Sequence, residues 1–269
     1  MEPQSFTALA VEDTGARVAI TLNRPDQRNS LDFAAWDELD AVMADVESRD
    51  DARVVTLTGA GAAFCAGVDF ATIGASLEVE RGSYPAFIRR WANIVDRFER
   101  VAQPSIVAIN GPVIGAGLEL ALAGDIRIAS DNAVFAMPQM QMGIVPDVGG
   151  TSRLARAAGE AFAKDMILTS RIVGAEEALR VGLVSRVVAP ERLAEELEEI
   201  AGAVQRLPWP SAYFATVAID VGPRLDPRRA ADIEAIADQV MLRQDEVWER
   251  ISAFMSGKGL RGVRPGEAQ

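Results

Sequence analysis

The chain has 269 residues, with 27 basic and 39 acidic side chains, a net charge of −12, one cysteine and no histidine. Because histidine is the commonest general base and metal ligand, its absence excludes Ser-His-Asp and Cys-His hydrolysis, histidine-bearing zinc sites and the non-haem iron triad. The acidic balance disfavours general binding to nucleic acid.

The composition is typical of a globular protein, with 49% hydrophobic and 25% charged residues. The lone Cys65 cannot form an internal disulfide, as expected in a reducing compartment. Residues 1–15 lack the basic and apolar regions of a signal peptide, and polar residues interrupt the apolar tract 105–129. We therefore expect a cytoplasmic protein without a membrane segment.

Strand and helix patterns alternate through the first half of the chain. Alternating or continuous apolar residues predict strands at 17–22, 53–58, 105–109, 126–129 and 134–136. Helical spacing predicts a helix from near Ser30, capped by Ser30 or Asn29, another over 84–100, and a third from Ala116 that closes at Gly124. This order predicts an α/β core.

The second half is mostly helical. A strand is predicted at 184–188, and helical segments follow Pro190. We expect a core over residues 1–200, a helical C-terminal region over 201–256 and a flexible tail over 257–269.

A strand and a glycine turn precede the helix that begins near Ala116. Gly115-Ala116-Gly117 lacks the third glycine of a dinucleotide loop, since Leu120 stands there. The first amides of the helix point outward and can stabilise developing negative charge. Glu119 in the first turn either complements the helix dipole or acts chemically, and its apolar setting favours chemistry.

A second glycine-rich loop, AAFCAGVDF, can expose another amide near Gly67 and Val68, or can be only a tight connection. Cys65 within it is interpreted as small buried filler, because no histidine or neighbouring lysine lowers its pKa. Asp147 precedes a helix, so it is either the N-cap of that helix or a carboxylate at the mouth of the cavity where the two glycine-rich segments expose their amides.

Five stretches together resemble the crotonase, or enoyl-CoA hydratase/isomerase, family: LNRPDQRNSLD, GAGAAFCAGVDF, QPSIVAINGPVIGAGLELALAGDIRIAS, MGIVPDVGGTSRLAR and GAEEALRVGLVSRVV. The resemblance covers residues 15–190 and the last helix. It implies a spiral of repeated ββα units, a helical C-terminal trimerisation region and a homotrimer or dimer of trimers. It also implies an acyl-CoA thioester substrate, with coenzyme A as part of the substrate and no separate cofactor or metal.

The resemblance also implies the site residues. The backbone N–H groups of Val68 and Ala116 match the family's oxyanion hole. The matched coenzyme A and substrate contacts are Arg28, Ala66, Gly67, Asp69, Phe70, Gly115, Pro138, Phe254 and Lys258.

Family hydratases hold water between two glutamates. Glu119 matches the first, but Gln139 stands in the place of the second and cannot exchange a proton. Asp147 stands where many family hydratases carry glycine, and this resembles the family's double-bond isomerases.

We therefore predict an acyl-CoA double-bond isomerase that acts through a stabilised enolate. Asp147 is the expected proton shuttle, Glu119 the second acid or base, and Gln139 a polar orienter. The alternatives are a 2-enoyl-CoA hydratase, in which Glu119 activates water, and a non-catalytic acyl-CoA-binding protein.

Overall fold

The computed structural model describes residues 6–72, 74 and 84–256. It divides into two compact units, a core unit of Met1–Ala201 and a C-terminal unit of Gly202–Gln269. The predicted tail 257–269, with Lys258, lies outside the described residues. None of the described helices is both long enough and apolar enough to cross a membrane.

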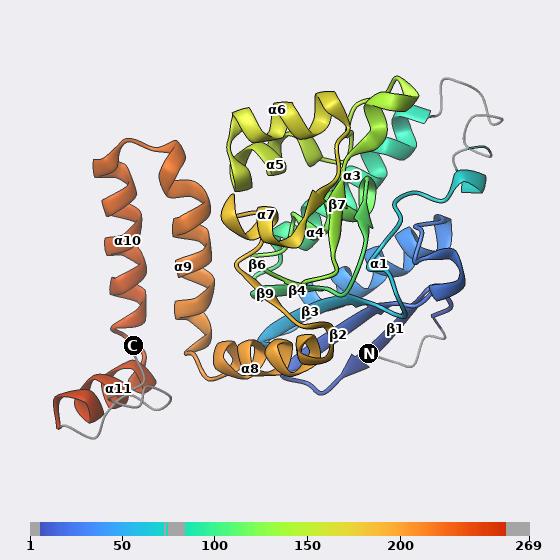
Figure 1. The fold of residues 1–269 in the computed structure, drawn as a ribbon. Helices are drawn as coiled ribbons and strands as arrows, with labels where there is room; N and C mark the ends of the chain where they lie inside the picture. The colour runs from blue at the N-terminus through green and yellow to red at the C-terminus, as the bar shows by residue number, and fades with distance from the viewer. Residues whose placement is uncertain (1–5, 73, 75–83, 257–269) are drawn as a thin grey trace. The chain divides into compact units, whose positions relative to one another are not determined.

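The core unit is built on a six-stranded sheet in the order β1-β2-β3-β4-β6-β9 (Figure 1). Its strands are β1 (Leu9–Asp13), β2 (Arg17–Leu22), β3 (Val54–Gly59), β4 (Ser105–Ile109), β6 (Ile126–Ser130) and β9 (Arg186–Val188). Only the β1–β2 pair is antiparallel. Every residue of β4 is buried, as expected for a parallel strand covered on both faces.

A second, three-stranded sheet carries the helix with Glu119. It has the order β5-β7-β8, made of β5 (Val113–Ile114), β7 (Val134–Ala136) and β8 (Val173–Gly174). Gly115 follows β5 directly and is the N-cap of α4 (Ala116–Ala121). The short β5 strand therefore fixes where the first amides of α4 lie.

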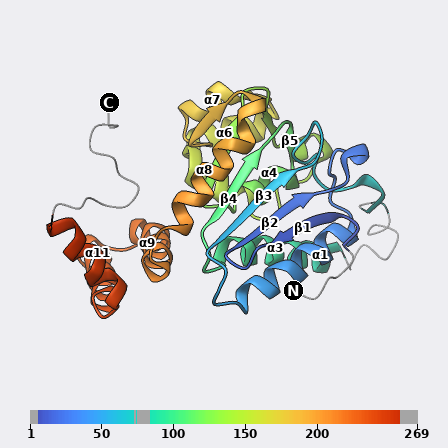
Figure 2. The ribbon, with the colours of Figure 1, turned by 90° about the horizontal axis from the view of Figure 1, so that it is seen from below.

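Helices α1 (Phe33–Glu47) and α3 (Tyr84–Arg100) pack against each other. Trp36 and Trp91 stack with their ring centroids 5.5 Å apart, and both side chains are buried. Figure 2 shows both helices on the same side of strands β1 to β4. The remaining helices of this unit include α5 (Gly150–Ala158), α6 (Glu160–Thr169) and α7 (Ala175–Arg180), with 3-10 turns at Pro25–Gln27, Pro138–Met142 and Pro190–Arg192.

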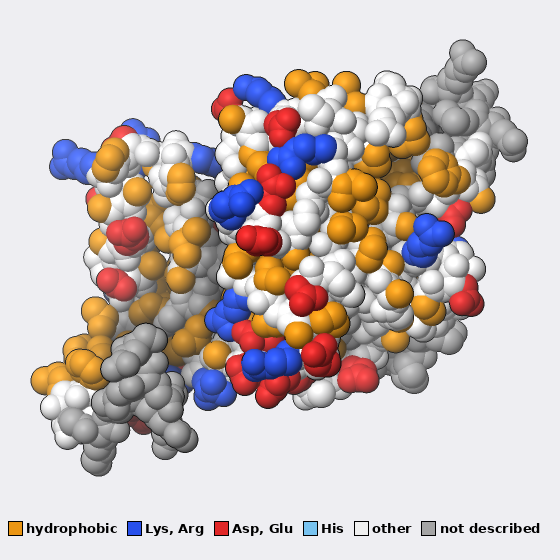
Figure 3. Space-filling model, in the orientation of Figure 1, with side chains coloured by type: hydrophobic (Ala, Val, Ile, Leu, Met, Phe, Trp, Pro, Cys, Tyr) orange, Lys and Arg blue, Asp and Glu red, His pale blue; other side chains and the backbone are white. Residues whose placement is uncertain are grey.

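The C-terminal unit is helical. Helix α8 (Leu193–Gln205) begins in the core unit, and α9 (Trp209–Val221), α10 (Pro227–Met241) and α11 (Asp245–Met255) follow, with a 3-10 turn at Gly222–Arg224. Large apolar side chains stay exposed on these helices, among them Ile219 and Ile236. Figure 3 shows such hydrophobic side chains along α9 and α10.

Most of the predicted elements are present, and several differ from the prediction. Helix α1 is capped by Asp32, whose side chain accepts from the Ala35 N–H at 2.8 Å, so the predicted cap at Ser30 or Asn29 was wrong. Helix α4 ends at Ala121 rather than at Gly124. Strand β9 is shorter than predicted, and β3 lies one residue later than the predicted 53–58. Strands β1, β5 and β8 were not predicted at all.

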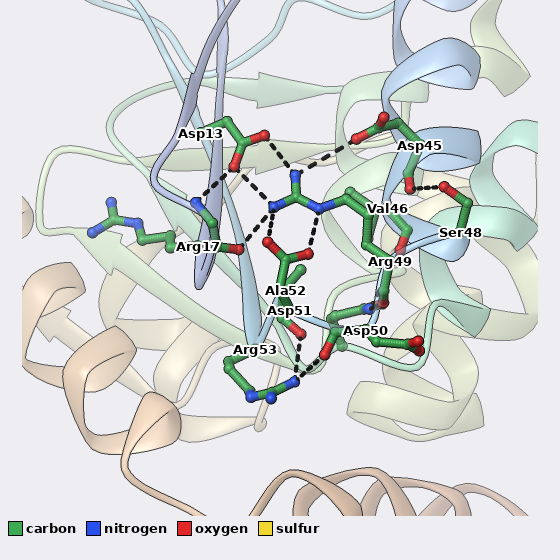
Figure 4. A network of polar contacts seen from close by, with 12 residues as sticks. Asp13, Arg17, Asp45, Val46, Ser48, Arg49, Asp50, Asp51, Ala52 and Arg53 are labelled. Atoms are coloured by element: carbon green, nitrogen blue, oxygen red, sulfur yellow. Dashed lines mark hydrogen bonds and ion pairs between the residues drawn. The ribbon is translucent and has the colours of Figure 1, made fainter. Parts of the chain in front are cut away.

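Arg49 joins the β1–β2 hairpin to the residues that follow α1 (Figure 4). Its guanidinium pairs with Asp13 and Asp51 and donates to the Gly15 carbonyl. The hydrogen bond from Arg49 lowers the pKa of Asp13 below its usual range. This network fastens one edge of the sheet to the end of α1.

Candidate active site

The loop that contains Cys65 and Val68 lies against β5 and the start of α4. The Ile114 N–H donates to the Cys65 carbonyl at 2.9 Å. Gly67 has a φ of +95°, and a Cβ there would lie 2.9 Å from the Ile114 oxygen and 3.6 Å from the Ala116 nitrogen. Only glycine therefore fits at Gly67, and its lack of a side chain lets the loop approach the first amide of α4.

Two backbone N–H groups at this junction have no acceptor among the residues that the structure describes. Leu31 donates to the Gly67 carbonyl and accepts from the Asp69 N–H, so the Val68 amide faces away from Leu31. Ala116 is the first residue of α4, where an N–H has no partner within the helix. Within the described part of the chain, neither amide has an acceptor. The pair can therefore hold an oxygen on which negative charge develops.

Cys65, beside these amides, is not placed as a nucleophile. Its thiol is buried and donates to the Asn29 carbonyl at 3.0 Å, and burial raises its pKa to about 12. A Cβ on Gly117 would lie 2.6 Å from the Cys65 Cβ, so the thiol occupies the space that this glycine leaves. Cys65 packs the loop against α4, in agreement with its interpretation as buried filler.

Glu119 is the buried carboxylate of the site, with 1% of its surface exposed. Its Oε1 accepts from the Val148 N–H at 3.0 Å and the Gly150 N–H at 2.8 Å, and its Oε2 accepts from the Gln139 Nε2 at 2.9 Å. Burial raises the pKa of Glu119 to about 7, and these three donors act in the opposite direction. Near neutral pH the group can therefore both accept and release a proton.

Gln139 lies in the 3-10 turn Pro138–Met142 and is 6% exposed. Because a carboxylate only accepts hydrogen bonds, the amide nitrogen of Gln139 faces Glu119. Its other atom, Oε1, is buried and finds no hydrogen-bond partner among the described residues. A buried acceptor without a partner is costly, so this oxygen is suited to a ligand or water molecule.

Asp147 is half-buried at the start of the loop that holds Glu119. The N-cap of α5 is Gly149, so the interpretation of Asp147 as a helix cap was wrong. Burial raises the pKa of Asp147, and its charge raises the pKa of Glu119 in turn. The two carboxyl groups are therefore electrostatically coupled.

The residues expected to contact coenzyme A do not all lie in one place among the described residues. Arg28 is exposed, and its carbonyl accepts from the Ala66 N–H at 2.9 Å. Pro138 begins the turn that carries Gln139, and Phe70 is 76% exposed. Phe254 lies on α11 in the C-terminal unit, and Lys258 lies outside the described residues.

The carboxylate of Asp69 is engaged within the protein. It accepts from the Ser30 hydroxyl at 3.0 Å and the Ala71 N–H at 2.9 Å, and the Arg24 guanidinium lies 3.5 Å away. Burial acts to raise the pKa of Asp69, but these partners lower it overall. We therefore assign its side chain to ordering the loop that follows Val68.

The sequence reasoning missed the amides of Val148 and Gly150. The signal available was the doublet Gly149-Gly150 at the start of a helix, because adjacent glycines let backbone N–H groups approach a side chain closely. Among the described residues, no group of three or more Cys, Asp and Glu side chains is placed to hold a metal ion.

Comparison with known families settles the relationship. The family description "Enoyl-CoA hydratase/isomerase" matches residues 13–255 of the chain. This protein belongs to the enoyl-CoA hydratase/isomerase family. Family relatives include the short-chain-enoyl-CoA hydratase of Clostridium acetobutylicum, 32% identical over 94% of this chain and 97% of the relative. The crotonyl-CoA hydratase of Syntrophomonas wolfei is 31% identical over 93% of this chain and 96% of the relative.

Solved structures of the family share the fold. An enoyl-CoA hydratase of Bacillus anthracis superposes with a TM-score of 0.88 at 33% identity, covering 93% of this chain and 97% of the other. A Thermobifida fusca structure solved in complex with acetoacetyl-CoA has a TM-score of 0.84 at 29% identity, covering 89% and 99%. The predicted family and the predicted crotonase-like α/β fold are thus confirmed.

Proposed function

We propose that this protein is a 2-enoyl-CoA hydratase, which adds water across the double bond next to a thioester. The observation that carries the proposal is Glu119, a buried carboxyl group with a pKa of about 7 that three N–H donors hold. It lies in the same helix as Ala116, whose amide, like that of Val68, has no acceptor among the described residues. The names of the two relatives support hydration better than the isomerisation that we first expected. The isomerase prediction remains the second candidate.

The proposed substrate places its thioester oxygen between the N–H groups of Val68 and Ala116. These amides belong to backbone that is already fixed, so they hold the enolate oxygen without reorganising during the reaction. They are donors only, and they therefore bind the transition state more strongly as charge develops on the oxygen.

Glu119 carries both proton transfers in the proposed mechanism. Its carboxylate takes a proton from water while the water oxygen bonds to C3, and the electrons of the double bond move into the thioester enolate. The protonated Glu119 then returns that proton to C2 as the enolate collapses. The carboxylate is regenerated, and the elements of one water molecule have been added.

Gln139 orients the water in this proposal. Its unpartnered Oε1 can accept one hydrogen of the water molecule, while the other hydrogen faces the Glu119 carboxylate. Gln139 itself neither loses nor gains a proton. One carboxyl group is sufficient because its pKa lies near the working pH.

Coenzyme A carries phosphate groups, which need local cations in a protein with a net charge of −12. Arg28 is the exposed cation beside the loop of Ala66 and is proposed as one such contact. Asp69 and Phe70 follow in the same loop.

The test is incubation with crotonyl-CoA and with a 3-enoyl-CoA in heavy-oxygen water, followed by mass spectrometry of the products. We expect crotonyl-CoA to gain one water molecule that carries the label. Bond migration in the 3-enoyl-CoA without labelled product would contradict the proposal and support an isomerase. Binding of coenzyme A in calorimetry without turnover of either substrate would support a non-catalytic protein.

The second candidate, a double-bond isomerase, is favoured by one observation, the coupling of Asp147 to Glu119. Two coupled carboxyl groups can relay a proton between two carbons. Asp147→Asn separates the candidates. A hydratase should keep its rate within about 10-fold, with the acidic limb of its pH profile moved to lower pH because a like charge is removed. An isomerase that depends on Asp147 should lose about 100-fold or more.

A further inference from the structure

Arg153 is a buried arginine next to the site that takes no part in the proposed proton transfers. It lies on α5, and 3% of its surface is exposed. Its Nη2 lies 2.6 Å from both Asp96 and Glu99 of α3, and its Nη1 donates to the Val148 carbonyl at 3.0 Å. The two carboxylates compensate the buried positive charge of Arg153 through Nη2. Nη1 is therefore available to the loop that contains Val148.

The Val148 carbonyl occupies a special place in that loop. Three consecutive peptide groups join Asp147 to Gly150. The first and third donate their N–H groups to the Glu119 Oε1, and the middle one presents its carbonyl to Arg153. Alternating bonds of this kind fix the orientation of all three peptides, because rotating any one of them breaks a bond on its own side.

The glycine doublet is compressed between Arg153 and Glu119. A Cβ on Gly149 would lie 1.8 Å from the Arg153 Nη1, and a Cβ on Gly150 would lie 2.6 Å from the Glu119 Cγ. Gly149 also has a φ of +102°. The two glycines therefore let the loop fit between the guanidinium on one face and the carboxylate on the other.

We propose that Arg153 is a positioning residue for Glu119, and that it acts by holding the Val148 carbonyl so that the amides of Val148 and Gly150 point at the carboxylate. The inference rests on the proposed role of Glu119. Through the Val148 peptide group, the position of Glu119 would then depend on the ion pairs that Arg153 makes with Asp96 and Glu99 of α3.

The charged groups around this path are few among the described residues. Glu119 is faced by Asp147, and Arg153 is faced by Asp96 and Glu99. Arg156 also pairs with Glu99, and Arg100 lies 3.9 Å from Asp96. Loss of Arg153 therefore leaves Glu99 with a remaining partner, while the loop loses the donor to Val148.

The test is a double-mutant cycle of Arg153→Met and Glu119→Gln, measured as kcat, KM and pH profile on the substrate that the enzyme turns over. Arg153→Met alone should lower kcat by about 10- to 100-fold, with KM changed less, because the carboxylate is misplaced. The acidic limb should move up by roughly one pH unit, since two bonds that stabilise the charged carboxylate are weakened. In the Glu119→Gln background, Arg153→Met should change the residual rate by less than about 3-fold.

The controls separate positioning from general destabilisation. Arg127→Met removes another arginine that donates to backbone carbonyls, those of Leu183 and Gly124, and should leave the pH profile in place. Arg153→Lys keeps the charge but not the planar fork, so it should give a smaller shift of the limb even where Arg153→Met fails to fold.

Two outcomes would overturn the proposal. One is an acidic limb that stays in place in Arg153→Lys and in any folded Arg153→Met. The other is an equal loss of rate with and without Glu119. If Glu119→Gln itself keeps the rate of the unmodified enzyme, the proposed function fails instead.

Discussion

Glu119 is subject to opposing effects on its pKa, of which burial is the larger. Burial among apolar side chains favours its neutral form, and the N–H donors of Gln139, Val148 and Gly150 favour its charged form. The result is a pKa of about 7. A carboxyl group in water would be ionised well below that pH and would be a poor proton donor at neutrality.

Glu119→Gln should reveal this balance in stability as well as in rate. Between pH 4.5 and about 7 the folded protein holds a proton on Glu119 that the unfolded chain releases, so the free energy of unfolding falls as pH rises through that window. The variant has no carboxyl group at this position, so its free energy of unfolding does not fall with pH for this reason. In urea unfolding, its free energy of unfolding should exceed that of the unmodified protein by about 3 kcal/mol above pH 7. Its kcat should fall by about 100- to 10,000-fold. A difference in the free energy of unfolding between the variant and the unmodified protein that stays constant from pH 4.5 to 8 would contradict the assigned pKa.

Residue-level prediction from the sequence was uneven for a physical reason. Glu119 was recognisable because a charge inside LELALA is costly without a purpose. Its bond with Gln139 joins positions 20 residues apart, and the bonds from Val148 and Gly150 come from backbone. Backbone amides carry no side-chain signature, so their convergence on Glu119 was visible only in the structure.

At the scale of elements, the site lies where short segments meet. Strand β5 leads through Gly115 into α4, and the turn before α5 closes over Glu119. These segments approach one another closely because glycines stand at the contacts. A single added methyl group should therefore disturb function more than stability.

Gly150→Ala tests this expectation. Its Cβ would lie 2.6 Å from the Glu119 Cγ, so the carboxylate must move. We expect kcat to fall about 100-fold, with a loss of about 1–3 kcal/mol in stability. Gly174→Ala is the matched control, since Gly174 also lies at the start of a helix but an added Cβ there would meet no neighbouring side chain or backbone within 4 Å. Equal kinetic effects of the two substitutions would refute the steric argument.

The Arg49 network makes a separate prediction for the edge of the sheet. Arg49→Met should lower the free energy of unfolding by about 1–2 kcal/mol at pH 7, a modest cost because solvent screens its partners. Because the pKa of Asp13 is lowered in the folded protein, this stabilisation is fully present above the ordinary pKa of a carboxyl group. It is lost as pH falls through the lowered pKa of Asp13. The difference between variant and unmodified protein should therefore shrink towards pH 3 in denaturant titrations. Lys164→Met, which removes only an exposed pair, should cost less than about 0.5 kcal/mol.

The elements predicted correctly are those in which burial leaves a periodic pattern. Arg17–Leu22 buries every second side chain and was predicted with its observed bounds, as was Tyr84–Arg100. Leu9–Asp13 is an edge strand that buries only Leu9, so no alternation marks it. The cap of α1 was misplaced because the side-chain oxygen of Asn29, which would have to accept from the helix, instead accepts from the Arg24 N–H at 2.9 Å.

At the scale of the whole molecule, the C-terminal unit leaves apolar surface uncovered. Ile219 of α9 is 72% exposed and Ile236 of α10 is 60% exposed. Exposed apolar surface of this extent is typical of subunit contacts. It is compatible with the homotrimer, or dimer of trimers, that the family resemblance implies, and we expect such an assembly.

Sedimentation velocity should therefore give a mass of three or six chains of 28.8 kDa. Ile219→Glu with Ile236→Glu should shift the population towards the single chain, because a buried charge opposes association. Gln239→Glu adds a charge at an exposed polar position of the same helix and should leave the assembly intact. A single chain at micromolar concentration before any substitution would contradict the expected assembly.

The chain's one cysteine gives the protein an internal reporter. Cys65 is buried, with its thiol on the Asn29 carbonyl, two residues before the loop glycine that meets the first amide of α4. A thiol reagent can reach Cys65 only when this loop opens, so the labelling rate under native conditions measures how often the loop opens. Ligand that binds the loop's amides should slow labelling in proportion to occupancy. The stability of this loop can thus be followed in the unmodified sequence, without any substitution.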